Sequence, residues 1–282
     1  MLEVYVARHQ GRTKRNKEMK KVAIYCVNYH SKDRLEHYLQ SIDRAVKATG
    51  GDLQLDVIAI DNSVPAEVID YVPEAFALKV VKTGENKGYF GAVREGMKHV
   101  DPMAYDYSII SNVDVVMEED FFVQLITAPT DKTLGWIAPQ IYSDAEHRDR
   151  NPKIMRRYAK RKLQILRFLF SIPPLYNLYT HTAYKSKKLI KHEAGEIYAG
   201  HGSFIILTQE YFKRCGIIDY PVFLFCEEIY LGEQCLKQGL KVEYCPNIKV
   251  IDAEHASTST FKRSKYCRYN YEALSYILKT YY

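Results

Sequence analysis

The stretch Ser108–Met117, SIISNVDVVM, decides the fold class because it has the pattern of a buried strand that ends in polar side chains. Apolar residues dominate it, yet Asn112 and Asp114 stand two positions apart near its end. Residues two apart on an extended strand point to the same face of a sheet. An unpaired buried carboxylate is costly, so Asp114 must be exposed at a strand end, paired, or bound to a cation.

The first half of the chain repeats this arrangement of an apolar run followed by polar residues. Strands are expected at Val22–Val27 and over LDVIAIDNS, ALKVVKT and YDYSIISNVD. Helices are expected over SKDRLEHYLQSIDRAVKA, from near Phe90, and over EEDFFVQLITA, with Ser31 as the N-cap of the first. Strands that alternate with helices predict an α/β fold with a mostly parallel, doubly wound sheet and helices on both faces.

Polar side chains gather where these strands end, and that edge is where such sheets bind ligands. They are Asn28, Asp61, Asn62, Asn86, Asn112 and Asp114. One acidic strand end is commonplace, whereas several that converge predict a site. Asp61 has acceptor oxygens suited to a base N–H or a ribose hydroxyl. The alternative role for Asp61 and its Asn neighbours is the turn and cap chemistry that these residues perform in many loops.

The pattern changes after Ala138, and a basic insert occupies about 147–192. RRYAKRKLQILRFLF predicts a basic amphipathic helix, which SIPPLYNLY is expected to break. EIYAGHGSFIIL predicts a turn and a strand, and FLFCEEIYL places Glu227 and Glu228 at the start of a helix. LKVEYCPNIKVIDAEHAS predicts one or two late strands that end at His255, and the Tyr-rich tail predicts a C-terminal helix.

At 282 residues, with 47% hydrophobic and 26% charged side chains, the chain has the composition of an ordinary globular protein. Six cysteines without a CxxC pair indicate reduced core thiols rather than a zinc cluster. No run of 18 apolar residues exists and the start lacks a secretory signal, so we expect a cytoplasmic protein. We expect a disordered basic leader over 1–18 and a single domain over 19–282, with Met19 as a hypothesis for the natural start.

The net charge of +6 is concentrated in the basic insert. Between His147 and His192 there are thirteen Lys or Arg residues and one acidic residue, Asp149. The amphipathic part could lie on an anionic membrane surface, grip an anionic acceptor such as a lipid diphosphate, or form a solvated basic face over a core helix. Positive charge without an RNP, zinc-finger or helix-turn-helix pattern argues against a nucleic-acid binder.

Several segments, in order, resemble the motifs of a family 2 glycosyltransferase with the GT-A fold, nearest to its bacterial rhamnosyltransferase-like branch. They are IYCVNYHSKDRLEHYLQSI, VIAIDNSV, NKGYFGAVREGM, SNVDVV, GHGSFIIL, FLFCEEIYL and AEHAS. The resemblance covers roughly 21–279. It implies a nucleotide-sugar-binding half over 19–130 and an acceptor-binding half over 131–282.

This resemblance implies an inverting, metal-dependent transfer from a UDP- or dTDP-sugar to a hydroxyl of a cell-surface polysaccharide or lipopolysaccharide precursor. The acceptor would be a glycan or a lipid-linked glycan, met by the enzyme as a peripheral protein on the inner face of the membrane. Mn2+ or Mg2+ would stabilise the leaving diphosphate, with Asp114 and His255 as metal ligands. The alternative for Asp114 is a cap on the following helix.

The resemblance also assigns residues to the two substrates. The nucleotide-binding residues are Asn28, Asp61, Asn86, Gly88 and Asn112. The acceptor-binding residues are Gly200, His201, Gly202 and Ser203. Gly88 is expected to permit a close approach of the backbone rather than to donate a bond of its own.

An inverting transfer needs a general base on the acceptor hydroxyl. In the family the base is the second member of a Glu-Asp pair, which here is Glu227-Glu228, and Tyr230 stands where the family often has another acid. Glu228 is the expected base and Glu227 the alternative, while both could instead form an acidic first turn that suits the helix dipole. A rival function is a catalytically impaired nucleotide-sugar-binding protein. The nucleotidyltransferase class is disfavoured because VNYHSKDRL lacks a glycine-rich loop.

Overall fold

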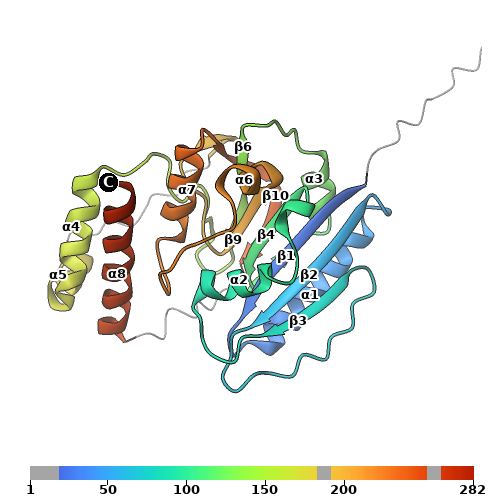
Figure 1. Ribbon diagram of the computed structural model, residues 1–282, viewed down its shortest axis with the longest axis horizontal. Coiled ribbons are helices and arrows are strands. Elements are labelled where there is room, and N and C mark those ends of the chain that lie inside the picture. Colours follow the sequence, from blue (N-terminus) through green and yellow to red (C-terminus); the bar gives the residue numbers. More distant parts are fainter. Residues whose placement is uncertain (1–18, 183–191, 253–261) are drawn as a thin grey trace, which may run out of the picture.

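The computed structural model describes residues 19–182, 192–252 and 262–282 (Figure 1). Its strands are β1 (Lys20–Asn28), β2 (Leu53–Asp61), β3 (Ala77–Lys82), β4 (Tyr107–Asn112), β5 (Val115–Met117), β6 (Leu134–Ser143), β7 (Arg148–Asp149), β8 (Gly195–Ile197), β9 (Phe204–Thr208) and β10 (Lys241–Asp252). Its α-helices are α1 (Lys32–Lys47), α2 (Tyr89–Met97), α3 (Phe121–Thr127), α4 (Lys160–Ser171), α5 (Pro173–Thr182), α6 (Gln209–Cys215), α7 (Glu227–Lys237) and α8 (Arg263–Tyr281). A short 3₁₀ helix, η1 (Pro102–Ala104), precedes β4.

All the strands join one sheet, whose main path is β3-β2-β1-β4-β9-β6-β10-β5. The first four strands on this path are parallel, as expected from the alternation of strands and helices. Asn28 pairs with Asp61 and Val27 with Asn112, so β1, β2 and β4 end at the same level. The register therefore brings the polar strand ends to one edge of the sheet.

The second half of the sheet is mixed rather than parallel. β9 runs antiparallel to both β4 and β6, whereas β10 runs parallel to β6. The chain leaves the carboxyl end of β6 and passes through α4 and α5. It then rejoins the sheet as β8, antiparallel to the first residues of β10, before β9 begins. The antiparallel direction of β9 delivers the residues just before Phe204 to the edge where β4 ends, because Phe204 pairs with Ser111.

Helices cover both faces of the sheet, which confirms the expected α/β layering (Figure 1). Alternate residues of β1 show the division, since successive side chains of a strand point to opposite faces. Ile24 and Cys26 join one core cluster with residues of α1 and α3. Ala23 and Tyr25 join the other, with residues of α2, α6 and α7.

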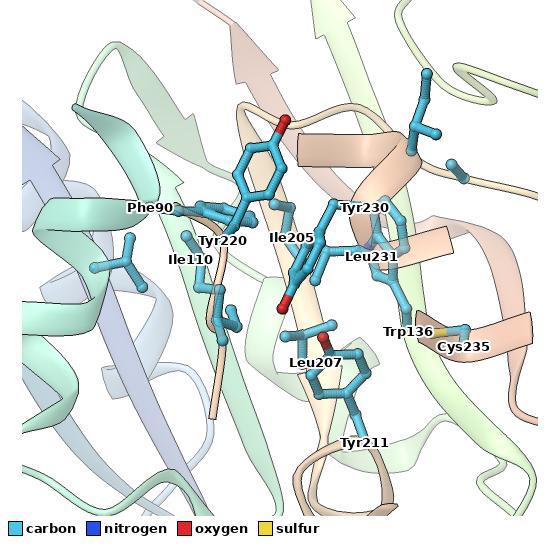
Figure 2. Packing of buried hydrophobic residues seen from close by; sticks show 14 of the residues in the cluster. Phe90, Ile110, Trp136, Ile205, Leu207, Tyr211, Tyr220, Tyr230, Leu231 and Cys235 are labelled. Carbon is cyan, nitrogen blue, oxygen red and sulfur yellow. The ribbon is translucent and has the colours of Figure 1, made fainter. Parts of the chain in front are cut away.

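Aromatic side chains fill the second cluster, as Figure 2 shows. Phe90 of α2 meets Tyr220 and Tyr230 edge-on, with ring centroids 6.0 and 6.3 Å apart. Trp136 of β6 is fully buried in the same cluster. Burial of such large side chains stabilises the fold and ties the two halves of the chain into one body.

A layer made of α4, α5 and α8 lies at one end of the molecule (Figure 1). The basic helix expected over RRYAKRKLQILRFLF is present as α4, but the expectation that SIPPLYNLY only breaks it was incomplete. α4 ends at Ser171 and α5 begins at Pro173, because proline's fixed φ and missing N–H suit the first turn of a new helix. No helix of the described residues is both long and apolar enough to cross a membrane. All six cysteines are free thiols, as expected.

Candidate active site

A cavity of about 350 Å³ opens at the carboxyl edge of the sheet. Its walls come from the loops after β1, β3 and β4, from the end of β10, from the turn before β9, and from the start of α7. Among the residues expected to form a site, it is lined by Asn86, Gly88, Asn112, Asp114, His201, Gly202, Ser203, Glu227 and Glu228. The volume lies in the range of small-molecule sites. Residues from distant parts of the sequence thus share one space.

Asp114 lies in the bend between β4 and β5 rather than on a strand. Its Oδ1 atom is buried and has no hydrogen-bond partner. Burial raises the pKa of Asp114, although Asn112 and the charges of Arg34 and Arg150 act in the opposite direction. An orphaned buried carboxylate oxygen carries a free-energy cost that a bound cation would remove.

The chemistry of this oxygen fits a hard divalent cation. Mg2+ is usually held by one or two carboxylates together with substrate phosphates rather than by a cage of protein ligands. Among the described residues, no group of three His, Cys, Asp or Glu side chains could hold a metal ion. The unpartnered Oδ1 of Asp114 has the chemistry of such a ligand, and the second expected ligand, His255, lies outside the described residues.

The paired glutamates at the start of α7 face different surroundings. Glu227 is buried, and its Oε1 accepts the N–H of Phe225 at 2.9 Å. Burial and the neighbouring Glu228 carboxylate raise the pKa of Glu227. Glu228 is only partly buried, and its Oε1 lies 3.3 Å from the N–H of Gly202, which it accepts. Glu227 holds the backbone of the loop before α7, whereas Glu228 contacts the turn before β9.

The loop before α7 has an unusual backbone. Phe225 and Cys226 adopt φ angles of 76° and 62° in succession, although neither is a glycine. Such left-handed conformations cost roughly 1–3 kcal/mol each and tend to occur at functional sites. The bond from the N–H of Phe225 to Glu227 holds this conformation. These two residues lead directly into α7, with Cys226 as its N-cap, and Glu228 lies in the first turn of that helix.

Tyr89, at the start of α2, connects the two sides of the cavity. Its hydroxyl donates to the carbonyl of Gly202 at 2.9 Å, and its N–H donates to the carbonyl of Phe223 at 3.1 Å. Tyr89 lines the cavity, and sequence reasoning did not single it out. The only signal was its place beside Gly88 in NKGYFG, where an aromatic residue opens a helix.

Gly88 is required for the close approach that was expected of it. Its φ is +74°, and a Cβ there would lie 2.0 Å from the carbonyl oxygen of Phe223. Asn86 accepts from the N–H of Gly88 at 3.0 Å and from the side chain of Asn62 at 2.9 Å. Asn62 itself lines the cavity. These bonds hold the loop after β3 in place as one wall of the cavity.

Asp61 and Asn28 lie beneath the cavity rather than in it. Both are fully buried. Asp61 accepts the N–H of Glu67 at 2.7 Å, the N–H of Ser63 at 3.2 Å and the Asn28 side chain at 3.1 Å. Each carboxylate oxygen of Asp61 therefore has a partner, and in this geometry it braces the loop after β2. Contact with a nucleotide by either residue stays a prediction from the sequence.

The residues of the glycine turn before β9 have two different roles: the first packs against the core, and the next three line the cavity. Gly200 is buried outside the cavity wall, and a Cβ there would lie 2.8 Å from that of Ala138. His201 and Ser203 line the cavity, with the His201 Nδ1 and the Ser203 Oγ 2.9 Å apart. The N–H of His201 donates to the Asn151 side chain at 2.7 Å. The residues that face the cavity are thus His201, Gly202 and Ser203.

Four Lys or Arg side chains of the described residues also line the cavity. They are Arg34, Arg150, Lys153 and Lys265. None was named as a site residue from the sequence, although two of them belong to the basic insert that was considered as a grip for an anionic acceptor. Arg150 forms an ion pair with the buried Asp252 of β10 at 3.1 Å. Asp252 pairs across the sheet with Val115, the residue that follows Asp114 in the sequence. Asp252 could have been found from the sequence, because it is one more acidic residue after a late apolar run. Arg150 could not be singled out from the sequence, because it is one of many Lys and Arg residues in the basic insert.

Comparison with curated proteins finds one sequence relative, the low-salt glycan biosynthesis hexosyltransferase Agl10 of Haloferax volcanii. It is 19% identical over 235 residues, which make up 83% of this chain and 66% of that protein. The chain therefore spans slightly less than two thirds of its relative. No family model matches the chain.

Solved structures share the fold at low sequence identity. TarS of S. aureus superposes with a TM-score of 0.53 at 10% identity, covering 83% of this chain and 37% of that one. TarS 1–349 in complex with UDP-GlcNAc gives 0.52 at 9% identity, with 86% and 61% covered. The mannosyltransferase PcManGT from Pyrobaculum calidifontis, in complex with GDP-Man and Mn2+, gives 0.50 at 15% identity, with 84% and 58% covered. These likenesses confirm the expected GT-A fold.

Proposed function

We propose that this chain is a glycosyltransferase that moves a sugar from a nucleoside-diphosphate donor to a hydroxyl group of a glycan acceptor. One observation carries the proposal: a single cavity holds both Asp114, with an unsatisfied buried oxygen, and Glu228, held by Gly202 on the opposite wall. The fold supports it, since ligands of open α/β sheets bind at the carboxyl ends of the strands. The weak similarity to a hexosyltransferase points the same way.

The Asp114 side of the cavity is assigned to the donor diphosphate. A divalent cation bound there by Asp114 would supply Lewis-acid stabilisation of the leaving diphosphate. Arg34 and Lys153 line the same space, and Arg150 there is balanced by its ion pair with Asp252; basic side chains around a cavity favour a phosphate-bearing ligand. A fold neighbour carries GDP-Man with Mn2+, which supports this class of donor and of ion.

The Glu228 side is assigned to the acceptor. As general base, the Glu228 carboxylate takes the proton of the acceptor hydroxyl, whose oxygen forms a bond to the anomeric carbon. The bond from that carbon to the diphosphate breaks, and the nucleoside diphosphate leaves with the electron pair. Attack from the side opposite the leaving group inverts the anomeric centre. Tyr89 holds the Gly202 carbonyl, and Gly202 in turn holds Glu228.

The class of substrates is proposed from the resemblance together with the comparisons. The donor is a UDP- or dTDP-sugar, and a fold neighbour that carries UDP-GlcNAc supports a uridine donor. The acceptor is a growing cell-surface polysaccharide or lipopolysaccharide chain, and the relative's name places that protein in glycan biosynthesis. Membership of the rhamnosyltransferase-like branch remains part of the proposal.

A second candidate is a catalytically impaired protein that only binds nucleotide sugars. The observation that favours it is Glu228 itself, because the resemblance places an Asp there and Glu adds one methylene. The hydrogen bond from Gly202 accommodates the longer side chain on the cavity wall. Transfer or hydrolysis of a donor sugar by the wild-type chain would remove this alternative.

The test begins with a thermal-shift panel of nucleoside diphosphates with and without Mn2+, followed by donor sugars on the best nucleotide. We expect UDP or dTDP to raise the melting temperature further when Mn2+ is present. Asp114→Asn should remove the Mn2+-dependent part of this shift while leaving the melting temperature of the unliganded protein unchanged or higher. Equal shifts with and without Mn2+ in both proteins would reject the assignment of Asp114.

A further inference from the structure

The outward side of α4 exposes large apolar side chains. Ile165, Phe168 and Ile172 are 52%, 58% and 42% exposed. Their spacing of three and four residues places them on one side of the helix, with Ile172 at its C-cap. Leu163 and Phe170 are buried on the opposite side, in the core cluster that also contains residues of α8. The helix is therefore apolar on two sides. The side with Leu163 and Phe170 packs against the core, whereas no described part of the chain covers the other side.

The surroundings of these side chains are basic. Arg161 stands one turn before Ile165 on the same side of α4 and is exposed. Neither α4 nor α5 contains an Asp or Glu, whereas α4 carries four Lys or Arg residues in KRKLQILRFLFS. An exposed apolar side beside a cation, on a helix without acidic residues, combines burial of apolar surface with attraction to anions. This combination is typical of helices that lie in the plane of an anionic bilayer.

We propose that the α4 outer face, defined as Arg161, Ile165, Phe168 and Ile172, docks on the surface of an anionic lipid bilayer. Charge complementarity selects this occupant. A second copy of the chain would bring two basic faces together, and like charges oppose such a contact. The α4–α5 layer also lies at one end of the molecule, where a flat surface can reach it (Figure 1).

The docking face is connected to the cavity through one helix. α4 packs against α8, and Lys265 near the start of α8 lines the cavity. A bilayer bound at α4 would therefore hold the cavity close to lipid-borne molecules. The consequence that the acceptor is carried on a lipid rests on the proposed function, whereas the docking itself does not.

The test is co-sedimentation of the full chain with vesicles of equal parts phosphatidylglycerol and phosphatidylcholine, compared with phosphatidylcholine alone. Ile165→Gln combined with Phe168→Gln should lower the bound fraction by roughly tenfold or more, because two apolar side chains lose their insertion. Arg161→Gln should lower it by about fivefold, and less at high salt. Leu236→Gln and Lys237→Gln are the matched controls, since Leu236 is 54% exposed and both lie on α7, away from the face.

Wild-type binding to the anionic vesicles, lost in the α4 variants and kept in the controls, supports the proposal. Absence of wild-type binding overturns it, as does equal binding by the α4 variants, which would point to another part of the chain. A wild-type dimer in light scattering without lipid that Ile165→Gln and Phe168→Gln convert to a monomer also overturns it, because a second copy then covers the face. Donor-sugar hydrolysis without lipid should be unchanged in every variant, so failure of docking and failure of the proposed function are distinguishable.

Discussion

β2 and β4 lie on either side of β1, and each has an aspartate at its carboxyl end. β2 ends at Asp61, and Asp114 follows β4; the two carboxylates differ in their hydrogen bonds. Asp61 has a partner for both oxygens, two of them backbone N–H groups of the loop that follows. Asp114 has a buried Oδ1 atom with no partner. A satisfied carboxylate stabilises its own loop, whereas an unsatisfied one is available to a ligand at no cost in existing bonds.

The same contrast separates the two glutamates of α7. Glu227 is buried and holds the N–H of Phe225, so its carboxylate is committed to the backbone of a strained turn. Glu228 shares a single longer contact with Gly202 on the cavity wall. Asp61 and Glu227 are thus committed to backbone N–H groups, although Glu227 also lines the cavity, whereas Asp114 keeps an oxygen without a partner and Glu228 has one longer contact.

We expect the largest effect from Glu228→Gln, which removes a carboxylate that lines the cavity and so lowers the rate of sugar transfer. Transfer should fall by about 10²- to 10⁴-fold, because a positioned general base contributes that much to a rate. Nucleotide binding in a thermal-shift assay should persist, since the amide oxygen can still accept from Gly202. Substantial turnover by this variant would shift the assignment to Glu227 or reject both.

Asp61→Asn tests the other side of the comparison. The free energy of unfolding should fall by roughly 1–3 kcal/mol, because at least one buried N–H loses its acceptor. Asp114→Asn is the matched control, and its unfolding free energy in denaturant should be unchanged or higher. If Asp61→Asn instead kept full stability and bound the nucleotide more weakly, direct contact with the nucleotide would replace the bracing role.

Glu227→Gln should change the pH dependence of stability. The folded pKa of Glu227 is raised above its ordinary value of 4.5, so the folded state holds its proton to higher pH than the unfolded state. Stability is then lost as the pH rises from that ordinary value through the raised one, at about 1.4 kcal/mol for each pKa unit. The glutamine variant cannot titrate there, so its stability should increasingly exceed that of the wild type as the pH rises through this window and stay higher above it.

Denaturant unfolding across pH checks this expectation. The two proteins should have similar stability in acid, where Glu227 is protonated and resembles the glutamine. A difference between them that does not vary with pH would show that the pKa of Glu227 is the same in the folded and unfolded states.

The smallest expected effect is on Tyr89→Phe, which removes the hydroxyl that holds the Gly202 carbonyl. Loss of one such bond should lower kcat by roughly threefold to tenfold while the donor KM stays unchanged, because only the Glu228 wall loses support. Tyr25→Phe is the control, since its hydroxyl donates to the carbonyl of Val100 at 2.8 Å, in the opposite part of the fold. Equal losses of kcat in both variants would make the role of Tyr89 purely structural.

Much of the fold and of the cavity could be predicted from the chain. The alternation of apolar runs and amphipathic stretches predicts the layered sheet, since periodicity is a local property. Asn112, Asp114, Glu228 and the turn at Gly202 were expected in a site, and the structure places all four around the cavity. Tyr89, Arg150 and Asp252 were missed, because a Tyr before a helix or an Arg in a basic segment has many ordinary uses.

The sequence by itself determined the alternating strands and helices of the first half of the chain, the basic helix α4 and the C-terminal helix α8, and that polar side chains follow the strands; it did not predict α5 or α6. Only the tertiary structure decided that β9 runs antiparallel, that both oxygens of Asp61 have partners while Oδ1 of Asp114 has none, and that Glu228 meets Gly202 on the cavity wall. The physical reason is that strand direction and hydrogen-bond satisfaction depend on partners far away in the chain. Gly202 and Glu228 come into contact only when the whole sheet has formed, and no local sequence pattern predicts that contact.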